Sequence, residues 1–450
     1  MPLIGHSSTE AVLAYRAGAP LSVRQFLHDL ERVRAALGPS AHVLNACADR
    51  YRFTVGFAAA VTAGKVSLLP STHTPEVIRQ LQAFAPDAVC LTDRPDCDIQ
   101  LPQVRYPSDA PAPRHGAVPP MPQIQTHQLA TCVFTSGSTG TPVPHAKTFG
   151  PLVQCVREEA VRLGLTSDAP WSIVATVPPQ HMYGFESSVL MALACGHALC
   201  AEHPFYPADI ARVLAAVPRP RLLISTPVHL RALTGTATAL PATDLIVSAT
   251  APLAQQLACE VEQRFNTRLM EIYGSTETGQ IAARRPTQGP EWTLWPGVRF
   301  LQRDEETWAE GGHIEQPTRM CDVLEPTGAG RFLLHGRLAD LVNIAGKRSS
   351  LAYLNHQLNS IAGVVDGAFF HWADPRSSHA EVSRVAACVV APELDAPRLI
   401  QALRERIDPV FLPRPLLFVP RLPRNATGKL PQEALQALAA AHPKAASSAA

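Results

Sequence analysis

The chain has 450 residues, of which 39 are Lys or Arg and 38 are Asp or Glu, so its formal net charge is +1. Hydrophobic residues make up 46% of the sequence and charged residues 17%, as in well-packed globular enzymes with two or more domains. The balanced charge and the lack of a basic stripe give nucleic-acid binding no electrostatic support, and no apolar run is long enough to span a membrane.

Helical spacing alternates with short apolar runs near the start of the chain. The pattern predicts helices over residues 22–37, 53–62 and 75–84, and strands over 42–47, 66–69 and 88–91. Alternation of this kind is typical of parallel α/β layers. A proline-rich stretch at 107–122 then predicts a linker that crosses the surface.

An apolar run at residues 129–134 predicts a buried strand that leads into a loop rich in glycine and hydroxyl groups. The loop consists of Thr135, Ser136, Gly137, Ser138, Thr139, Gly140 and Thr141. Glycines let the backbone approach a ligand, and backbone N–H groups with hydroxyls can surround a polyphosphate. It is not a Walker A motif, because no Lys follows Gly140 directly. A plain surface loop has the same composition, so this segment alone leaves both interpretations open.

The alternation resumes after this loop. It predicts helices over 185–194 and 254–265, and strands over 172–177, 221–224, 244–248 and 268–272. Ligands in open α/β sheets bind beyond the carboxyl ends of the strands. We therefore expect the loops that follow Phe134 and Ile272 to share one crevice.

The second of these loops begins with Tyr273, Gly274, Ser275, Thr276 and Glu277. A flat ring such as that of Tyr273 can stack on a nucleotide base. A carboxylate such as Glu277 suits Mg²⁺, which prefers oxygen ligands in the company of phosphates. A turn with a solvated Glu is the plainer alternative.

The final third of the sequence changes character. Residues 292–334 have a β-rich pattern, and Asp322 and Arg337 could bind a ribose diol or form an ordinary ion pair. Beyond residue 338, a small α+β unit is predicted, with strands over 364–372, 384–390 and 416–419 and helices over 397–407 and 431–439. Within it, Lys429 follows a turn, where a lysine can bring positive charge to a carboxylate that attacks a phosphate or can simply be solvated.

Taken in order, these segments resemble the signatures of the adenylate-forming superfamily, which includes acyl- and aryl-acid ligases and luciferases. The matching patterns are T-S-G-S-T-G-x-P at 135–142, H-x-x-G at 181–184, Y-G-x-T-E at 273–277, Asp322 with the G-R pair at 336–337, and P-R-x-x-x-G-K at 423–429. The resemblance implies a large N-terminal domain of mixed α/β layers with parallel sheets, and a small mobile C-terminal α+β domain. We place them at residues 1–337 and 338–441, with a disordered tail at 442–450.

The resemblance also implies a reaction and the residues that perform it. A carboxylic acid attacks the α-phosphate of ATP in the presence of Mg²⁺, and the acyl group then passes from the adenylate to a phosphopantetheine thiol. Lys429, Thr276 and His181 would be catalytic, and Glu277 would hold the metal. The nucleotide would contact the phosphate loop (135–141), Ala249, Thr250, Tyr273, Gly274, Ser275, Asp322 and Arg337.

The sequence departs from the family pattern in three places. The phosphate loop usually ends in Pro-Lys, but here Val143 follows Pro142, and Lys147 is the candidate substitute. Ala339 occupies the position of the usual hinge Asp, with Asp340 next to it. Ala249 and Thr250 stand where glycines are common. By resemblance, Gly346 lies near the mouth of the thiol tunnel.

The acid is predicted from the segment around Tyr183. Amino-acid activators carry an anion here for the substrate ammonium, but Tyr183 takes that position, and Glu186 is expected to be solvated or to cap a helix. Met182, Tyr183 and Phe185 suit a flat apolar site, although an apolar core helix explains them nearly as well. We therefore expect a non-amino acid.

The short chain and its Pro-x-Pro-His-x-Lys run resemble bacterial ligases that load hydroxybenzoates onto an acyl carrier protein for pigment synthesis. Transfer to free coenzyme A, a degenerate regulatory nucleotide-binding protein and a luciferase-like oxygenase remain alternatives. The ten cysteines lack C-x-x-C spacing, which favours buried free thiols and a reducing cytoplasm.

Overall fold

The computed structural model describes residues 1–70, 72–112, 118–136, 142–165, 169–304, 306–337, 340–344, 347–372, 384–424 and 430–441. The predicted phosphate-loop residues 137–141, Ala339, Gly346, Lys429 and the tail lie outside this set, as do the side chains of Ser136 and Arg337. The chain divides into two compact units. The first comprises Met1–Gly289, Thr293–Leu301 and Ala309–Thr318, and the second Pro290–Trp292, Gln302–Trp308 and Arg319–Ala450.

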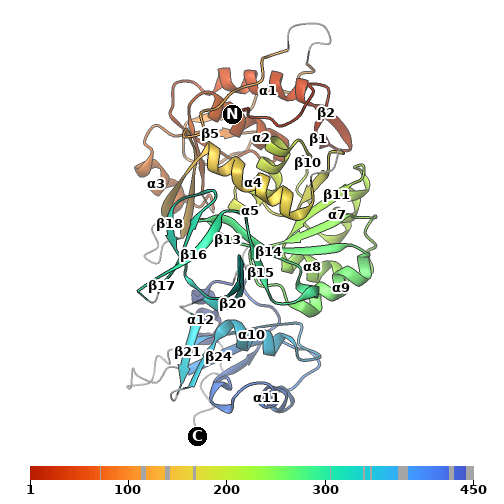
Figure 1. Cartoon of the computed structure of the whole chain (residues 1–450), viewed down its shortest axis with the longest axis vertical. Helices are drawn as coiled ribbons and strands as arrows, with labels where there is room; N and C mark the ends of the chain where they lie inside the picture. The colour runs from red at the N-terminus through yellow and green to blue at the C-terminus, as the bar shows by residue number, and fades with distance from the viewer. Residues whose placement is uncertain are drawn as a thin grey trace. The chain divides into compact units, whose positions relative to one another are not determined.

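The first unit contains two main sheets and the helices that cover them, and most of a three-stranded sheet formed by residues 298–303, 306–311 and 314–319 (Figure 1). Its strands up to residue 200 are β1(Val12–Arg16), β2(Ala19–Ser22), β3(His42–Asn45), β4(Val66–Leu69), β5(Val89–Thr92), β6(Gln103–Arg105), β7(Leu129–Ser136), β8(Pro142–Thr148), β9(Ser172–Ala175) and β10(Ala198–Cys200). Then follow β11(Arg221–Ser225), β12(Leu245–Ser248), β13(Arg268–Ser275), β14(Gly279–Arg284), β15(Trp292–Leu294), β16(Val298–Arg303), β17(Glu306–Gly311) and β18(Ile314–Arg319), some of which cross the unit boundary.

The helices of this unit follow most of the predicted periodicity. They are α1(Val23–Ala36), α2(Arg50–Thr62), α3(Pro75–Phe84), α4(Phe149–Leu163), α5(Met182–Gly184), α6(Met191–Cys195), α7(Pro207–Ala215), α8(Pro227–Thr234) and α9(Gln255–Phe265). A π-helix, η1(Phe185–Leu190), joins α5 to α6, and a short 3₁₀ turn, η2(Pro286–Gln288), follows β14. Strand β4 and helix α3 have the bounds predicted from the sequence, whereas α4, α7 and α8 were not predicted.

The smaller sheet of the first unit has the strand order β6-β5-β3-β4-β7-β8. Its neighbours pair in parallel except at the edge, where β7 and β8 form an antiparallel hairpin. The apolar side chains of β3, β4, β5 and β7 pack with α3 into one core cluster. The sheet therefore ends in the hairpin that carries the predicted phosphate loop at its tip.

The larger sheet runs β15-β14-β13-β12-β11-β9-β10-β1-β2 within the first unit. Strands β9 to β13 are parallel to their neighbours, and β14 returns antiparallel to β13. Helices α7, α8 and α9 bury their apolar residues against β9, β11, β12 and β13. Figure 1 draws these helices beside the strands of this sheet. This sheet is the predicted parallel α/β layer.

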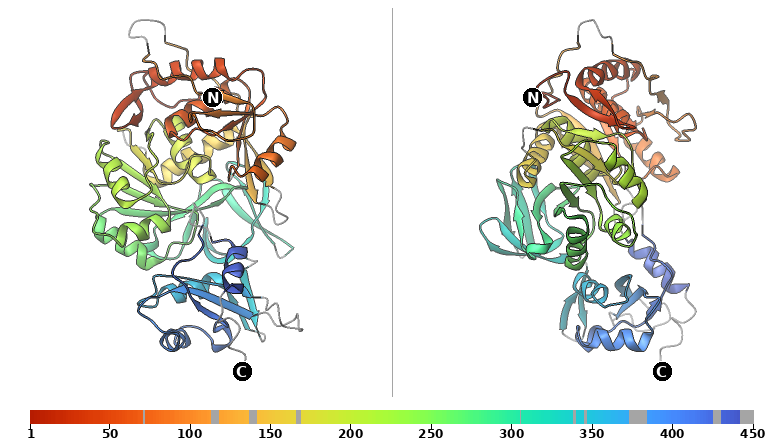
Figure 2. Two further views of the ribbon diagram at one scale, coloured as in Figure 1. Left: turned by 180° about the vertical axis from the view of Figure 1, so that it is seen from behind. Right: turned by 90° about the vertical axis from the view of Figure 1, so that its right-hand side faces the viewer.

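Helix α2 packs against strands of both sheets, since it contacts β3 and β4 on one side and β10 on the other. It is buried almost all round, which its run of Phe, Val and Ala permits. The side chain of Asp49 caps its first turn by accepting a hydrogen bond from the Arg52 N–H. Helix α1, red in Figure 2, packs along α2.

The second unit contains the region beyond residue 338 that was predicted to be α+β, together with strands β19 and β20 before it. Its elements are β19(Asp322–Gly328), β20(Arg331–Arg337), β21(Leu341–Ile344), β22(Lys347–Ser350), α10(Leu351–Asn359), β23(Asp366–Trp372), β24(Arg384–Val390), α11(Ala396–Arg404), η4(Pro409–Phe411), β25(Leu416–Phe418) and α12(Gln432–Ala440). Strands β23, β24 and β25 form one sheet between two apolar clusters, to which α10 and α11 contribute on one side and α12 on the other. The boundary of the compact units differs from the predicted domain boundary after Arg337, which stays a prediction.

Two predicted loops begin as strands instead. Strand β7 continues through Ser136 and β13 through Ser275, because each pairs with the strand that follows it in a hairpin. Thr135 and Ser136 therefore lie on β7, and Tyr273, Gly274 and Ser275 on β13. The extra pairing fixes the backbone of these residues, which a loop would not do.

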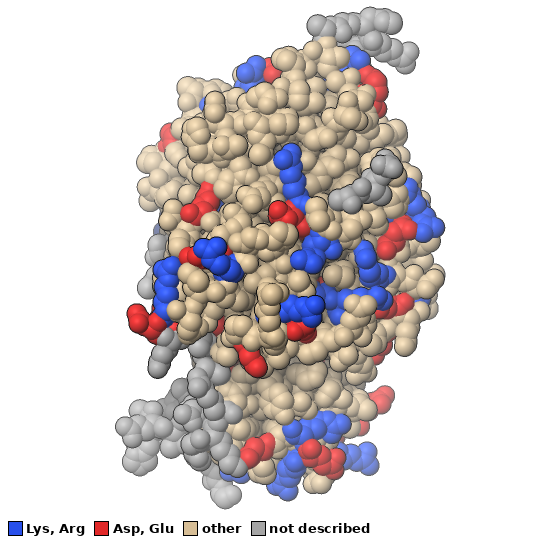
Figure 3. Space-filling model, in the orientation of Figure 1, with Lys and Arg blue, Asp and Glu red and all other residues tan. Residues whose placement is uncertain are grey.

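Three expectations from composition can be compared with the structure. All ten cysteines are free, and most are buried, but Cys321 is exposed. No helix in the described part of the chain combines the length and the apolar character needed to cross a membrane. On the face drawn in Figure 3, basic and acidic side chains are interspersed rather than gathered by sign.

Candidate active site

Several predicted site segments lie at one edge of the larger sheet. Strands β9, β11, β12 and β13 are parallel, so their carboxyl ends meet at that edge. Ala249 and Thr250 follow β12 directly, and Tyr273 to Glu277 close β13. His181 lies in the segment after β9 and starts helix α5 as its N-cap residue. This edge is where ligands bind in open α/β sheets.

The turn between β13 and β14 presents Glu277. Ser275 and Thr278 close it through their hydroxyl groups, whose oxygens are 3.1 Å apart. A Cβ on Gly274 would lie 2.3 Å from the Gly279 carbonyl oxygen, and Gly279 has φ +70°, so the turn needs glycine at both positions. The side chain of Glu277 remains 42% exposed at the turn.

Strand β8 reaches this turn from the other sheet. The His145 Nε2 lies 2.9 Å from the Thr135 Oγ1 and 3.5 Å from a carboxylate oxygen of Glu277. Lys147, two residues further along the strand and therefore on the same face, donates from Nζ to the backbone carbonyl of Glu277 at 2.6 Å. The imidazole of His145 thus lies between Thr135, a predicted phosphate-loop residue, and Glu277, the predicted metal residue.

The electrostatics of β8 reflect partial burial. Burial lowers the pKa of Lys147, while the charges of Glu186, Glu315 and Glu277 act in the opposite direction. Burial and the charge of Lys147 lower the pKa of His145, against the effect of Glu277. Burial therefore favours the neutral imidazole of His145, and the countercharges nearest Lys147 belong to the protein.

The prediction that Glu186 is solvated or caps a helix is wrong. Its side chain is buried inside the π-helix η1, where its Oε1 accepts a hydrogen bond from the Cys155 thiol at 3.3 Å. The same oxygen lies 2.9 Å from the position that a Cβ on Gly279 would take. Burial raises the pKa of Glu186 to about 7. The packing of η1 against α4 and β14, distant in sequence, turns this residue inward.

A second buried carboxyl lies beside it. The Ser187 Oγ lies 2.7 Å from a carboxylate oxygen of Glu159 on α4, and the Gln280 amide nitrogen, turned toward Glu159, donates to the same carboxylate at 3.1 and 3.2 Å. Burial, followed by the charge of Glu186, raises the pKa of Glu159 to about 8. These two carboxyls lie behind the Glu277 turn and carry a proton at neutral pH more readily than exposed ones do.

The segment around His181 is anchored from three sides. The Tyr183 hydroxyl donates to the Val247 carbonyl of β12 at 3.0 Å. A Cβ on Gly184 would lie 2.2 Å from the Pro178 oxygen, so only glycine fits there. Phe185 is fully buried, with its ring edge-on to Phe57 of α2 at 4.9 Å, so it belongs to the core rather than to an acid pocket.

Arg50, the first residue of α2, also supports this segment. It is fully buried, and its guanidinium donates to the carbonyls of Ala175 and Val177 at 3.0 and 2.8 Å and to the Ser188 hydroxyl at 2.7 Å. Burial lowers its pKa to about 10. The guanidinium therefore ties the carboxyl end of β9 to the π-helix.

The loop after β12 carries backbone strain. Thr250 has φ +79°, a left-handed conformation that a β-branched residue rarely adopts. Glycines are common here in the family that the sequence resembles, which the positive φ explains. Glu271 holds the loop by accepting a hydrogen bond from the Leu253 N–H at 2.9 Å, and Arg284, its cross-strand neighbour, neutralises it at 2.7 Å.

The remaining predicted residues lie in the second unit or outside the described residues. Asp322 and Arg337 are direct register partners on β19 and β20. Lys429 and Thr139 are among the residues that the structure does not describe. A common cleft around Thr139, Glu277, Asp322 and Arg337 therefore stays a prediction.

Sequence reasoning missed His145, Arg50 and Glu271. The alternation of His145 and Lys147 is a signal of a strand, but Pro142 and Pro144 obscure it, because prolines are rare in strands away from sheet edges. Strand β8 lies at the edge of its sheet, where prolines are tolerated. Nothing local marks Arg50 or Glu271, because their partners are distant in sequence.

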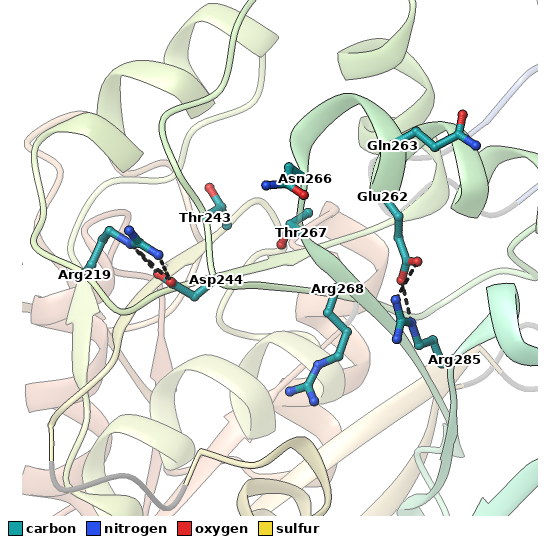
Figure 4. Close-up of a pocket in the computed structure, with 9 residues that line it drawn as sticks. All are labelled: Arg219, Thr243, Asp244, Glu262, Gln263, Asn266, Thr267, Arg268 and Arg285. Atoms are coloured by element: carbon teal, nitrogen blue, oxygen red, sulfur yellow. Dashed lines mark hydrogen bonds and ion pairs between the residues drawn. The ribbon is translucent and has the colours of Figure 1, made fainter.

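A polar pocket of about 460 Å³ lies at the opposite, amino-terminal ends of the same strands (Figure 4). Arg219 pairs there with Asp244 at 3.1 and 3.2 Å, and Arg285 with Glu262 at 2.9 Å. Arg268 donates to the Leu163 carbonyl at 2.6 Å. Most of the charge in this pocket is thus compensated within the protein.

Glu277 is the residue predicted to hold a metal ion at the carboxyl edge. Among the described residues, no group of three or more His, Cys, Asp or Glu could hold a metal ion. A single partly exposed carboxylate nevertheless suits Mg²⁺, which keeps several waters and usually takes one or two carboxylates together with substrate phosphates.

Comparisons with known proteins agree with this geometry. The family model described as AMP-binding enzyme matches residues 10–307. A 4-coumarate–CoA ligase of Rhodobacter capsulatus is 32% identical over 53% of this chain, which spans 59% of that relative. A 4-coumarate–CoA ligase of Halorhodospira halophila is 30% identical over 68% of this chain and 75% of its own length. The o-succinylbenzoate CoA synthetase of Bacillus subtilis, solved with its acyl-adenylate intermediate, has the same fold, with a TM-score of 0.79, 17% identity and 96% of both chains covered.

Proposed function

Because this chain belongs to the family of AMP-binding enzymes, we propose that it joins a carboxylic acid to the α-phosphate of ATP and passes the acyl group from the adenylate to a thiol. The observation that carries this proposal is the convergence of β8 on the Glu277 turn. Thr135, His145 and Lys147 of one sheet meet Glu277 of the other. A site that handles polyphosphate and metal needs hydroxyls, a cation and a carboxylate in this proximity.

The proposed roles follow the geometry and the family pattern. Glu277 would hold Mg²⁺, which would supply positive charge to neutralise the phosphates. The phosphate loop cradles the β- and γ-phosphates, Thr276 contacts the α-phosphate, and Tyr273 packs on the adenine. Lys429 brings a positive charge to the attacking carboxylate and the α-phosphate, since two anions must meet there.

The remaining contacts to nucleotide and acid extend this assignment. Asp322 and Arg337 bind the ribose, which their register on neighbouring strands suits. Ala249, Thr250, Gly274 and Ser275 line the adenylate, and His181 lies beside the acyl group. A movement of the small domain after Arg337 then exchanges Lys429 for the thiol.

We propose an aromatic acid such as a hydroxybenzoate as the substrate. Glu186 is buried and bound to Cys155, which argues against an exposed anion for an amino-acid ammonium. The named relatives are ligases of 4-coumarate, and the structural neighbour acts on o-succinylbenzoate. Met182 and Tyr183 supply nearly buried apolar surface beside His181.

For the acceptor we propose the phosphopantetheine of an acyl carrier protein, with free coenzyme A as the second candidate. The Pro-x-Pro-His-x-Lys run supports the carrier protein, whereas the names of the relatives support coenzyme A. A degenerate nucleotide-binding protein is disfavoured because Glu277 and Lys429 are both retained.

Acid-dependent ATP–pyrophosphate exchange tests the proposal. A panel of benzoates, cinnamates, fatty acids and amino acids identifies the acid, and subsequent addition of coenzyme A or a phosphopantetheinylated carrier protein identifies the acceptor. We expect exchange with an aromatic acid and a loss of at least about a hundred-fold in Lys429→Ala, with folding intact. Undiminished exchange in that variant contradicts the assigned role, and no exchange with any acid contradicts the function.

A further inference from the structure

We propose that Lys147 is a positioning residue that holds the Glu277 turn in place for Mg²⁺ and ATP, rather than a replacement for the missing phosphate-loop lysine. This inference rests on the proposed function, because it takes Glu277 as the metal residue. It gives the Pro-x-Pro-His-x-Lys run a role in holding the Glu277 turn. Lys147 binds the backbone carbonyl of Glu277, and His145 lies beside its carboxylate.

The direction of the Lys147 side chain is the first argument. Its ammonium leaves β8 of the smaller sheet and donates to the Glu277 backbone carbonyl at 2.6 Å, across to the turn of the larger sheet. Glu315, which accepts a hydrogen bond from the Thr148 N–H at 3.2 Å, supplies negative charge beside it. The ammonium of Lys147 is therefore directed toward groups of the protein itself, namely the Glu277 turn and the residues that pack around it.

The construction of the turn is the second argument. The ammonium of Lys147 holds the carbonyl of Glu277, and the His313 Nε2 lies 3.0 Å from the carbonyl oxygen of Thr278. Burial lowers the pKa of His313 to about 4, so its neutral ring donates to that oxygen. The carbonyls of Glu277 and Thr278 are thus both bound by residues from outside the turn. The Glu277 carboxylate remains exposed.

His145 completes the arrangement from the same face of β8. Its Nε2 is within 3.5 Å of the Glu277 carboxylate and 2.9 Å of the Thr135 hydroxyl. Lys147 therefore orients the backbone of Glu277, while His145 limits the swing of its side chain. Partners that orient a metal ligand commonly contribute about ten- to a hundred-fold to metal affinity.

Calorimetric titration of the full chain with ATP, with and without Mg²⁺, distinguishes the two roles. If Lys147 positions Glu277, Lys147→Met weakens ATP binding about ten-fold or more in Mg²⁺ and leaves metal-free binding nearly unchanged. Lys147→Arg, which keeps the charge and the donor, should retain most of the affinity. Pyrophosphate exchange in the same variants should show the loss mainly as a higher Mg²⁺ requirement.

Lys65 provides a matched control. It is a buried lysine that, like Lys147, donates to a backbone carbonyl, that of Gly38 at 2.8 Å, but it lies in the turn before β4. Lys65→Met should lower the melting temperature without changing the effect of Mg²⁺ on ATP binding. If Lys147→Met does not fold, comparison of Lys147→Gln with Lys147→Arg replaces it, because glutamine lacks both the charge and the reach.

The outcomes separate this inference from the proposed function. Equal weakening with and without Mg²⁺ in Lys147→Met indicates a direct phosphate contact and overturns the inference, as does unchanged binding in both conditions. Glu277→Gln should abolish the benefit of Mg²⁺. If Glu277→Gln keeps that benefit, the metal assignment in the proposed function fails, whatever Lys147→Met does.

Discussion

The two ends of the parallel strands β9, β11, β12 and β13 both carry arginines and carboxylates, but they use them differently. At the amino ends, Arg219–Asp244 and Arg285–Glu262 are partly exposed ion pairs that line a pocket. At the carboxyl ends, Arg50 and Glu186 are fully buried, and each holds a loop or helix in place through hydrogen bonds. Solvent screens the first kind of charge and not the second, so the same residue types should contribute very different free energies.

The largest effect should come from Arg50→Met. It leaves two buried carbonyls and the Ser188 hydroxyl without their donor, and such losses amount to about 3 kcal/mol or more. Urea unfolding should show this decrease in the free energy of unfolding, with the β9–η1 region affected first in hydrogen exchange. A loss below about 1 kcal/mol would show that water or a local rearrangement supplies new hydrogen-bond partners to these carbonyls and to the Ser188 hydroxyl. The energetic contrast between the carboxyl and amino ends of the strands would then weaken.

The free energy of unfolding should depend on pH with opposite signs for a carboxyl near the carboxyl ends of the strands and one near their amino ends. Burial raises the pKa of Glu159 to about 8, above its unfolded value, so its contribution is complete at low pH and is lost as pH rises through 8. Glu159→Gln should therefore reduce the fall in unfolding free energy between pH 6 and 8, by at most about 1.4 kcal/mol per pH unit.

Glu262 is the matched carboxyl at the amino end. Although partial burial acts the other way, hydrogen bonds from Arg285, the Leu269 N–H and Thr287 lower its pKa. Its contribution is present above the unfolded pKa and is lost as pH falls, so Glu262→Gln should change the acid limb alone. Denaturant titrations across pH check both variants, and a flat profile between pH 6 and 8 in the wild-type chain contradicts the assignment for Glu159.

A smaller effect concerns backbone strain. Thr250 at the carboxyl end and Asn266 before β13 both have positive φ, +79° and +47°. Asparagine tolerates this region, whereas a β-branched residue is strained by about 1 kcal/mol or more. Thr250→Gly should raise the melting temperature, and Asn266→Gly should leave it nearly unchanged. The reverse order would mean that contacts of the Thr250 side chain outweigh its strain.

The smallest effect should come from Arg219→Gln. The Arg219 side chain is 61% exposed, so solvent screens its ion pair with Asp244, and the small contribution of this pair to stability should weaken further in salt. Neither ATP binding nor pyrophosphate exchange should change. A loss of ATP binding in this variant would move functional importance to the amino-end pocket.

The sequence could predict the features that local patterns determine, but not those that depend on packing between distant segments. Strand β4 and helix α3 have their predicted bounds because their periodicity is strong and flanked by turn signals. The adenylate-forming family is confirmed by the family match. Glu186 was wrongly predicted to be solvated or to cap a helix, because its burial depends on Cys155 and Gly279, which lie 31 and 93 residues away in the numbering. Strand β8 was missed because edge position, which makes its prolines acceptable, is a property of the sheet.

A crystal structure of the chain with ATP and Mg²⁺ tests the central claim most directly. We expect the phosphates beside Thr135, the metal on Glu277 and the adenine against Tyr273, with Lys147 still bound to the Glu277 carbonyl. Nucleotide bound instead among Arg219, Arg268 and Arg285, at the amino ends of the strands, would contradict the account.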